Sequence, residues 1–383
     1  MRVLVHCIYF PPEVGGLESH VHFLCRGLVE RGHSVSVVTS RSQPDLPVED
    51  ELDGIRIYRT WMPSRTPAGW TVHGLGSTAA TRREARQSDI IHAQAFQSIV
   101  PCALARMGRS TPLVATLHTS HFLKLAERRG IRPGLHRLVK VPDYNLAASI
   151  EIAQVAEALG PGVTVEALAN GVDTTFFRPQ EPTLPKTPGR VRLIAPRRLF
   201  QKNGVKYLIR ALPSVLNQLE ADLLIVGDGP ERGRLESLVD ELEIRESVTF
   251  LGARPHEDMP GLLSSADLAV FPSLMEATSV AALESMACEL PVAASNVGGL
   301  PEIVDDQVGA LFPPSDPEGI AEAILGLTKD GQLETLGRRA RNRVTLNWSN
   351  DRLVDRHLEI YQSLLTGEAQ GADGPPRRNE ARG

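Results

Sequence analysis

The chain has 383 residues, of which 42% are apolar and 23% charged, and its formal net charge at pH 7 is −5. These values are typical of a soluble globular protein, and the length favours two domains. The lack of a basic surplus argues against a nucleic-acid-binding protein. No apolar run reaches the ~20 residues that a membrane-spanning helix needs.

The first residues and the cysteines point to a cytoplasmic protein. The start, MRVLVHCIYFPPE, has an early Pro pair and a short apolar run, so we expect a first strand rather than a signal peptide. Four cysteines lie far apart and form no CxxC pair, which favours free thiols in a reducing compartment over disulfides or zinc. They are Cys7, Cys25, Cys102 and Cys288.

The first half of the chain alternates short apolar strands with amphipathic segments of helical length. This alternation predicts a parallel sheet covered by helices. After the first strand, Leu17, Val21, Leu24 and Leu28 recur at near-helical spacing, and Gly32 follows as a stop signal. The predicted strands cover residues 3–10, 34–39, 55–60, 89–93, 113–117 and 145–148.

The second half repeats this pattern after a proline-rich stretch. Residues 178–189, RPQEPTLPKTPG, hold four prolines in twelve residues and show no periodicity, which is the composition of a linker. Strands are predicted at 191–195, 221–226, 248–251, 267–271, 291–294 and 309–312, and an amphipathic helix at 350–365. We therefore expect two doubly wound α/β domains and a cleft facing the carboxyl ends of their sheets.

The segment from Phe271 to Glu284, FPSLMEATSVAALE, ends a strand, crosses a turn and opens a helix at Ser279 that runs to about Cys288. A helix N-terminus offers unpaired N–H groups and a positive dipole to an anion. Glu284 lies about 7.5 Å further along the axis, at ~1.5 Å per residue. With Glu276 in the turn, the segment predicts a grip for a nucleotide sugar. Alternatively, Glu276 is an ordinary first-turn acid and Glu284 a solvated helix residue.

Basic residues follow the first strand of the second half. Arg197, Arg198 and Lys202 precede Gly204 and a helix, a place suited to a diphosphate, and a solvated basic loop is the alternative. The turn GDGP at 227–230 allows close backbone approach to a ligand. Neither a GxGxxG nor a Walker sequence is present, which argues against a dinucleotide dehydrogenase and a nucleoside triphosphatase.

Two features of the first half also follow strands. Gly15 and Gly16 lie between the first strand and the first helix, and His118 ends the strand LVATLH, from which we expect it to point into the cleft. His121 suggests a metal pair with His118. Because no carboxylate or cysteine completes a ligand set nearby, we expect no metal.

Together these motifs resemble the retaining glycosyltransferases of family 4, over residues 1 to about 365. The resemblance rests on GGLESHVHFL, NGVDTTFF (170–177), RRLFQKNGV (197–205), IVGDGP (225–230), FPSLMEATSVAALESMAC and NVGGLPEIV (296–304). It implies a GT-B fold of two Rossmann-like domains and a retaining hexosyltransferase that uses a UDP-sugar. The implied parts are an acceptor domain at 1–177, a linker at 178–190, a nucleotide-sugar domain at 191–348 and a crossover helix at 349–366. Residues 367–383, rich in Gly, Pro, Arg and Glu, have the composition of a disordered tail.

The resemblance also assigns roles to residues. Glu284 would bind the ribose hydroxyls, and Glu276 the hydroxyls of the donor sugar. Arg198 would hold the diphosphate, with Lys202, although this lysine stands one position earlier than usual and Asn203 precedes Gly204. The implied catalytic residues are His118, Glu276 and Arg198, and the implied donor-binding residues are Gly16, Arg198, Lys202, Glu276, Ser279, Val280 and Glu284.

The resemblance implies a reaction on one face of the sugar, with the leaving phosphate taking the acceptor's proton and no metal or other cofactor. Ala277, Thr278 and Ser279 replace the usual Gly-Phe-Gly, which favours a less common donor such as an amino sugar. As a compact member of the family with this altered turn, the chain also resembles the actinomycete enzymes that glycosylate aminocyclitols in aminoglycoside antibiotics. We therefore expect a small hydroxylated acceptor and no nucleic-acid partner.

Two alternatives remain open from the sequence. Residues 124–140 carry seven charged side chains, six of them basic, so this segment lies either on an anionic membrane surface or in solvent. The first case would make a lipid the acceptor. The second alternative is a non-catalytic module that binds a nucleotide sugar, and detection of donor hydrolysis would exclude it.

Overall fold

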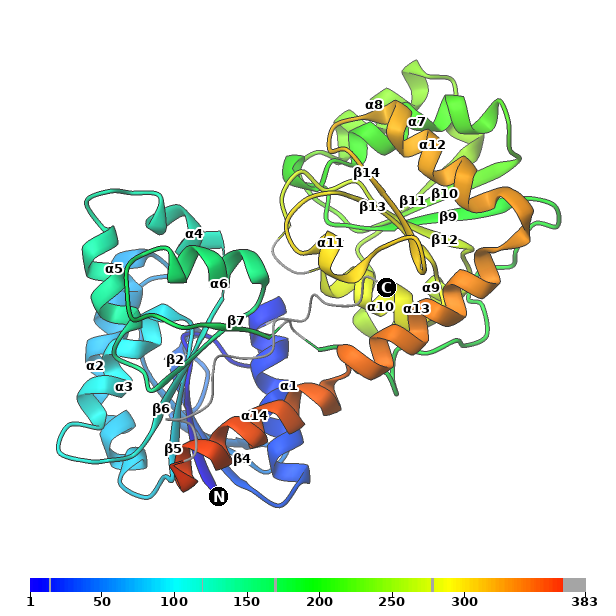
Figure 1. Ribbon diagram of the computed structural model, residues 1–383. Helices are drawn as coiled ribbons and strands as arrows, with labels where there is room; N and C mark the ends of the chain where they lie inside the picture. The colour runs from blue at the N-terminus through cyan, green and yellow to red at the C-terminus, as the bar shows by residue number, and fades with distance from the viewer. Residues whose placement is uncertain (14, 119, 169–170, 277–278, 368–383) are drawn as a thin grey trace. The chain divides into compact units, whose positions relative to one another are not determined.

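The computed structural model describes residues 1–13, 15–118, 120–168, 171–276 and 279–367 (Figure 1). This part of the chain forms two compact α/β units. Unit 1 runs from Met1 to Asn170 and resumes at Asn350, whereas unit 2 comprises Gly171–Ser349. Each unit contains a largely parallel sheet with helices packed on it, which confirms the predicted fold class.

Unit 1 is built on an eight-stranded sheet of order β3-β4-β2-β1-β5-β6-β7-β8, in which only the β3–β4 pair is antiparallel. Chain order reverses between β1 and β5, so the carboxyl ends of these neighbouring strands form a topological switch point. The strands are β1 (Arg2–His6), β2 (Ser34–Arg41), β3 (Glu49–Leu52), β4 (Ile55–Trp61), β5 (Ile90–Gln94), β6 (Leu113–Leu117), β7 (Tyr144–Ala147) and β8 (Glu166–Ala167).

The helices of unit 1 include one from the far end of the chain. They are α1 (Gly16–Glu30), α2 (Pro67–Ala85), α3 (Ile99–Ala105), α4 (Ser120–Ala126), α5 (Arg132–Val139), α6 (Ile150–Glu157) and α14 (Asn350–Thr366). Figure 1 shows α14 beside α1, where Arg31 bonds to Asp351 and Asp355. A Cβ atom on Gly27 would lie 2.5 Å from Val354, so glycine permits this close approach.

Unit 2 contains a six-stranded parallel sheet of order β11-β10-β9-β12-β13-β14, with apolar clusters on both faces. Here chain order reverses between β9 and β12. The strands are β9 (Val191–Pro196), β10 (Ala221–Val226), β11 (Val248–Gly252), β12 (Leu268–Phe271), β13 (Val292–Ser295) and β14 (Gly309–Phe312). The helices are α7 (Val205–Leu216), α8 (Arg232–Glu241), α9 (Met259–Ser264), α10 (Val280–Ala287), α11 (Leu300–Ile303), α12 (Pro317–Thr328) and α13 (Leu333–Asn347).

The expected linker differs from the structure. Unit 2 begins at Gly171, and residues 178–190 are hydrogen-bonded to it rather than free of both units. The Leu184 N–H donates to Ser265 Oγ at 3.0 Å, and Lys186 Nζ lies 2.6 Å from Asp267 Oδ1. The expected crossover helix begins at Asn350 and belongs to unit 1. Of the expected tail, residues 368–383 lie outside the described part of the chain.

Candidate functional site

The candidate site lies at the carboxyl edge of the unit 2 sheet, where β9 and β12 are neighbours. Open α/β sheets bind ligands at such switch points. The loops at this edge pack so closely against one another that two positions require glycine. A Cβ on Gly204 (φ +65°) would lie 1.8 Å from Pro272 O, and one on Gly227 (φ +140°) would lie 2.3 Å from Arg197 O. The sequence thus builds a tightly packed loop cluster at this edge.

A buried ion pair joins the two central loops. Arg197 follows β9 and Glu276 follows β12, and Arg197 Nη2 donates to Glu276 Oε2. The same nitrogen lies 3.0 Å from Asn203 Oδ1 and 2.8 Å from Ser273 Oγ. The side chains of Arg197 and Glu276 are 9% and 16% exposed, so the pair is largely shielded from water. The arginine guanidinium also faces the ring of Phe271, at 5.6 Å from its centroid.

Two polar groups of this loop cluster have no hydrogen-bond partner among the described residues. One is Arg197 Nε, on the guanidinium that already holds Glu276. The other is Ser279 Oγ, on a side chain that is only 1% exposed. Buried polar atoms are normally paired, so both are suited to contact a ligand.

The predicted cation cluster divides in the structure. Arg197 turns into the loop cluster, whereas the side chains of Arg198 and Lys202 are exposed. Arg198 lies over the ring of Phe200, with its guanidinium carbon 5.7 Å from the centroid. Among the described residues, neither exposed cation forms an ion pair with Glu276 or Glu284. Contact of Arg198 and Lys202 with a diphosphate therefore stays a prediction, and Arg197 is the cation that the structure joins to Glu276.

Helix α10 begins at Val280, one residue later than predicted, and Ser279 is its N-cap. Glu284 lies on this helix with 14% of its side chain exposed. Its Oε1 is 3.2 Å from Nε2 of His256, and this hydrogen bond raises the pKa of His256. Ala277 and Thr278, at which the sequence differs from the usual Gly-Phe-Gly of the family, lie outside the described residues.

His256, which the sequence patterns did not indicate, comes from the loop after β11. Its ring stacks on Phe176 with centroids 5.6 Å apart and an interplanar angle of 8°. Phe177 meets it edge-on, with a centroid distance of 5.0 Å. The one available signal was its position after a strand of the same sheet, because carboxyl ends of parallel strands share an edge.

The two site residues predicted in the first half lie in unit 1. Gly16 is the first residue of α1, which follows β1. His118 comes directly after β6, but it is only 3% exposed and its Nε2 lies 2.8 Å from Gln94 Oε1. Burial lowers the pKa of His118 to about 3, so the imidazole is neutral near pH 7. Within unit 1 His118 is therefore a buried, hydrogen-bonded residue, and its predicted place in the cleft near the donor sugar stays a prediction.

His118 belongs to a buried group of histidines, which we term the histidine array. His20 meets His118 edge-on at 5.0 Å, and neither ring nitrogen of His20 has a partner among the described residues. His92 lies 5.4 Å from His357 between ring centroids, and its Nδ1 is 2.6 Å from the Tyr361 hydroxyl. Burial lowers the pKa of all four imidazoles. The array thus links α1, β5 and the end of β6 to α14.

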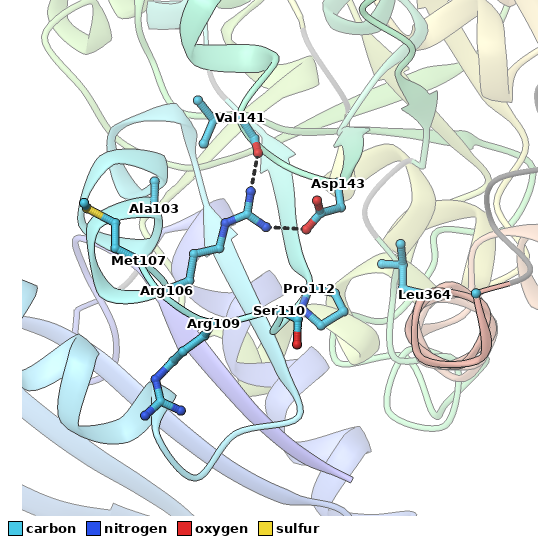
Figure 2. A pocket seen from close by; sticks show the side chains of 11 residues that line it. Ala103, Arg106, Met107, Arg109, Ser110, Pro112, Val141, Asp143 and Leu364 are labelled. Carbon is cyan, nitrogen blue, oxygen red and sulfur yellow. Dashed lines mark hydrogen bonds and ion pairs between the residues drawn. The ribbon is translucent and has the colours of Figure 1, made fainter.

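Unit 1 contains two other candidate features, a pocket and the side chain of His121. A pocket of about 630 Å³ is lined by residues that precede β6 and β7, at the opposite edge of the sheet from His118, and by Leu364 and Gly367 at the end of the chain's last helix. Arg106 donates there to Asp143 and, at 2.7 Å, to Val141 O (Figure 2). His121 packs against Trp70 and Phe96. The described residues include no group of three or more His, Cys, Asp or Glu side chains that could hold a metal ion.

The basic segment at 124–140 forms parts of α4 and α5, and some of its polar groups have partners within unit 1. Arg132 Nη2 donates to Ala158 O at 2.6 Å, and His136 Nε2 lies 3.1 Å from Pro161 O. Leu135 and Val139 are buried. No helix within the described ranges is long and apolar enough to cross a membrane.

Family models match most of the chain. Residues 14–176 match the model described as Glycosyltransferase Family 4, and residues 178–343 match that of Glycosyl transferases group 1. The chain is 27% identical to N-acetyl-alpha-D-glucosaminyl L-malate synthase of Bacillus anthracis, over 94% of this chain and 97% of that protein. It is 28% identical to a GDP-mannose-dependent alpha-(1-6)-phosphatidylinositol monomannoside mannosyltransferase of Mycobacterium tuberculosis, over 94% and 98%.

The fold is also that of solved glycosyltransferase structures. Anabaena HepE in complex with UDP superposes with a TM-score of 0.75 at 21% sequence identity, covering 95% of this chain and 100% of that one. The two parallel-sheet units therefore form the predicted GT-B fold.

Proposed function

The chain belongs to the group 1 glycosyltransferases of family 4, and from this premise we propose that it is a retaining hexosyltransferase. It would move a sugar from a nucleotide sugar to a hydroxyl group of a small acceptor. The observation that carries this proposal is the buried Arg197–Glu276 pair at the switch point of unit 2. Glu276 lies four residues before the α10 helix, which also bears Glu284. A cation, a helix N-terminus and two carboxylates suit a sugar diphosphate.

In this proposal the protein acts by positioning and by charge stabilisation. The bond between the sugar's anomeric carbon and the diphosphate breaks, and its electron pair leaves with the phosphate oxygen. The acceptor oxygen bonds to the same face of the sugar, and its proton passes to the leaving phosphate. Cationic side chains and the N-terminus of α10 would stabilise the departing charge. Glu276 would accept hydrogen bonds from the sugar and Glu284 from the ribose, which orients the donor.

We propose a UDP-sugar as the donor. The complex of HepE with UDP supports a uridine nucleotide. The mannosyltransferase relative is described as GDP-mannose-dependent, so a guanosine nucleotide is the alternative. The replacement of Gly-Phe-Gly by Ala277, Thr278 and Ser279 favours an amino sugar. The four free, buried thiols suit a reducing cytoplasm, where we propose that the enzyme acts.

We propose a small polar acceptor, and an aminocyclitol is the class that the sequence resemblance suggests. The relative that is named a glucosaminyl malate synthase supports a small hydroxylated acceptor. The name of the mannosyltransferase relative includes a phosphatidylinositol derivative, so a lipid acceptor is the alternative to a small polar one.

A screen of donors against acceptors, with products detected by mass spectrometry, tests this function. The donors are UDP-N-acetylglucosamine, UDP-glucose and GDP-mannose, and the acceptors are aminocyclitols, small hydroxy acids and phosphatidylinositol in vesicles. We expect a glycosylated small acceptor with a UDP-sugar, and loss of product with Glu276→Gln. Binding of UDP without transfer or donor hydrolysis would instead favour a non-catalytic module.

A further inference from the structure

The cation that pairs with Glu276 is Arg197, not one of the two that the resemblance assigns to the diphosphate. The resemblance places a lysine immediately before Gly204, but this chain has Asn203, which is 4% exposed and carries no charge. Asn203 Oδ1 accepts from Arg197 Nη2 at 3.0 Å, so the arginine occupies the neighbourhood of that side chain. Lys202 is one residue earlier and exposed. The positive charge beside Glu276 is therefore supplied by Arg197, which directly follows β9.

The surroundings of Arg197 leave it with unused donor capacity. A guanidinium carries five N–H donors in a planar fork, and Nη2 alone contacts Glu276, Ser273 and Asn203. The side chain is only 9% exposed, and its Nε is buried without a partner among the described residues. A buried donor without an acceptor is unfavourable, so an anionic acceptor at this atom would be stabilising.

We propose that Arg197 is a catalytic residue that contacts the diphosphate of the bound donor while it keeps its hydrogen bond to Glu276. This assignment rests on the proposed function and names the cation of that same site. The guanidinium would use Nη2 for the carboxylate and its remaining N–H groups for phosphate oxygens, which an ammonium on a flexible stem reproduces poorly. Arg197 thereby couples the orientation of the sugar-binding carboxylate to the charge of the leaving group.

The test compares nucleoside diphosphate with monophosphate binding, because only the former presents the group that Arg197 would contact. Calorimetry with UDP, UMP, GDP and GMP gives the diphosphate-to-monophosphate affinity ratio for the preferred base. We expect Arg197→Gln to reduce this ratio at least tenfold and to lower kcat for donor turnover by about 10²–10³-fold, the scale for loss of one preorganised donor. Arg197→Lys should restore part of the ratio but less of kcat. Lys206→Ala, a neighbouring cation outside the site, is the matched control.

A second variant guards against misfolding, because Arg197→Gln leaves the carboxylate of Glu276 buried without its cation. Arg197→Gln with Glu276→Gln removes both charges, and melting curves and the monophosphate affinity report its fold. We expect it to bind UMP normally and to lose the diphosphate preference. A wild-type ratio in a folded Arg197 variant, or loss of the ratio in Lys202→Ala instead, would overturn the proposal. If the wild-type protein binds no nucleoside diphosphate, the proposed function itself fails.

Discussion

Replacement of His20 by leucine should make unit 1 less sensitive to acid. His20 is 5% exposed, and neither ring nitrogen has a partner among the described residues. Burial lowers its pKa well below the ordinary value, and its neighbours His118, His357 and His92 lower it further. An apolar side chain of similar size removes an unsatisfied polar group, so His20→Leu should be neutral or stabilising at pH 7.

The sign and size of the effect follow from linkage. The folded-state pKa is lower than the unfolded value of ~6.5, so the unfolded chain binds the proton first and stability falls as the pH drops below about 6.5. The loss continues until the pH reaches the folded-state pKa. From pH 7 to pH 5, one such histidine costs about 2 kcal/mol, at 1.36 kcal/mol per pH unit. His118 and His357, with pKa values lowered to about 3 and about 4, add to the loss through the same window.

Urea unfolding at pH 7 and pH 5, followed by hydrogen exchange in β5 and β6, measures the effect in unit 1. Wild-type protein should lose several kcal/mol between the two pH values, and His20→Leu about 2 kcal/mol less. His136→Gln, outside the histidine array, serves as the control and should follow the wild type. Equal losses in wild type and His20→Leu would show that His20 does not take up a proton on unfolding in this pH range.

Three further predictions concern unit 2. Glu284→Ala should weaken nucleoside diphosphate binding by roughly 1.5–3 kcal/mol, the scale for a hydrogen bond to a charged group, and unchanged affinity in calorimetry would remove Glu284 from the ribose. Glu284→Gln should lower the pKa of His256, because the Glu284 hydrogen bond raises it; an NMR titration with an unchanged midpoint would show that the contact is absent in solution. The stabilising interaction with protonated His256 should be present at low pH and lost as the pH rises through this raised pKa. Arg198→Ala should reduce kcat far more than the melting temperature, and a normally folded variant with near wild-type turnover would make Arg198 a surface residue.

Much of the fold follows from local sequence patterns. All twelve predicted strands occur in the structure, since apolar runs between glycine and polar turns mark buried parallel strands. The first ends at His6 rather than Phe10. Two strands were missed for a physical reason: β3 has mainly exposed, acidic residues, and β8 spans only Glu166–Ala167. Neither presents an apolar run that a periodicity argument can detect.

Of the candidate site, the sequence indicated the part that lies within one segment, and the roles of these residues stay predictions. Glu276, Ser279, Val280 and Glu284 fall within nine residues, and the helix start differs from the prediction by one residue. The sequence could not show whether Arg197 or Arg198 pairs with Glu276. This pairing depends on which guanidinium contacts Asn203 and Ser273 in the folded loops.

Contacts between distant segments were also beyond reach. His256 and Glu284 come together from separate loops, and the burial of His118 depends on helices that the local pattern does not place. Such contacts require the tertiary arrangement that the structure supplies.

The anomeric configuration of the product tests the central claim most directly. Purified protein is incubated with a UDP-sugar and the acceptor identified by the screen, and proton NMR follows the anomeric signals with time. We expect UDP to be released in step with a glycoside that keeps the donor's anomeric configuration. A product of inverted configuration, or UDP binding with neither transfer nor hydrolysis of any donor, would contradict it.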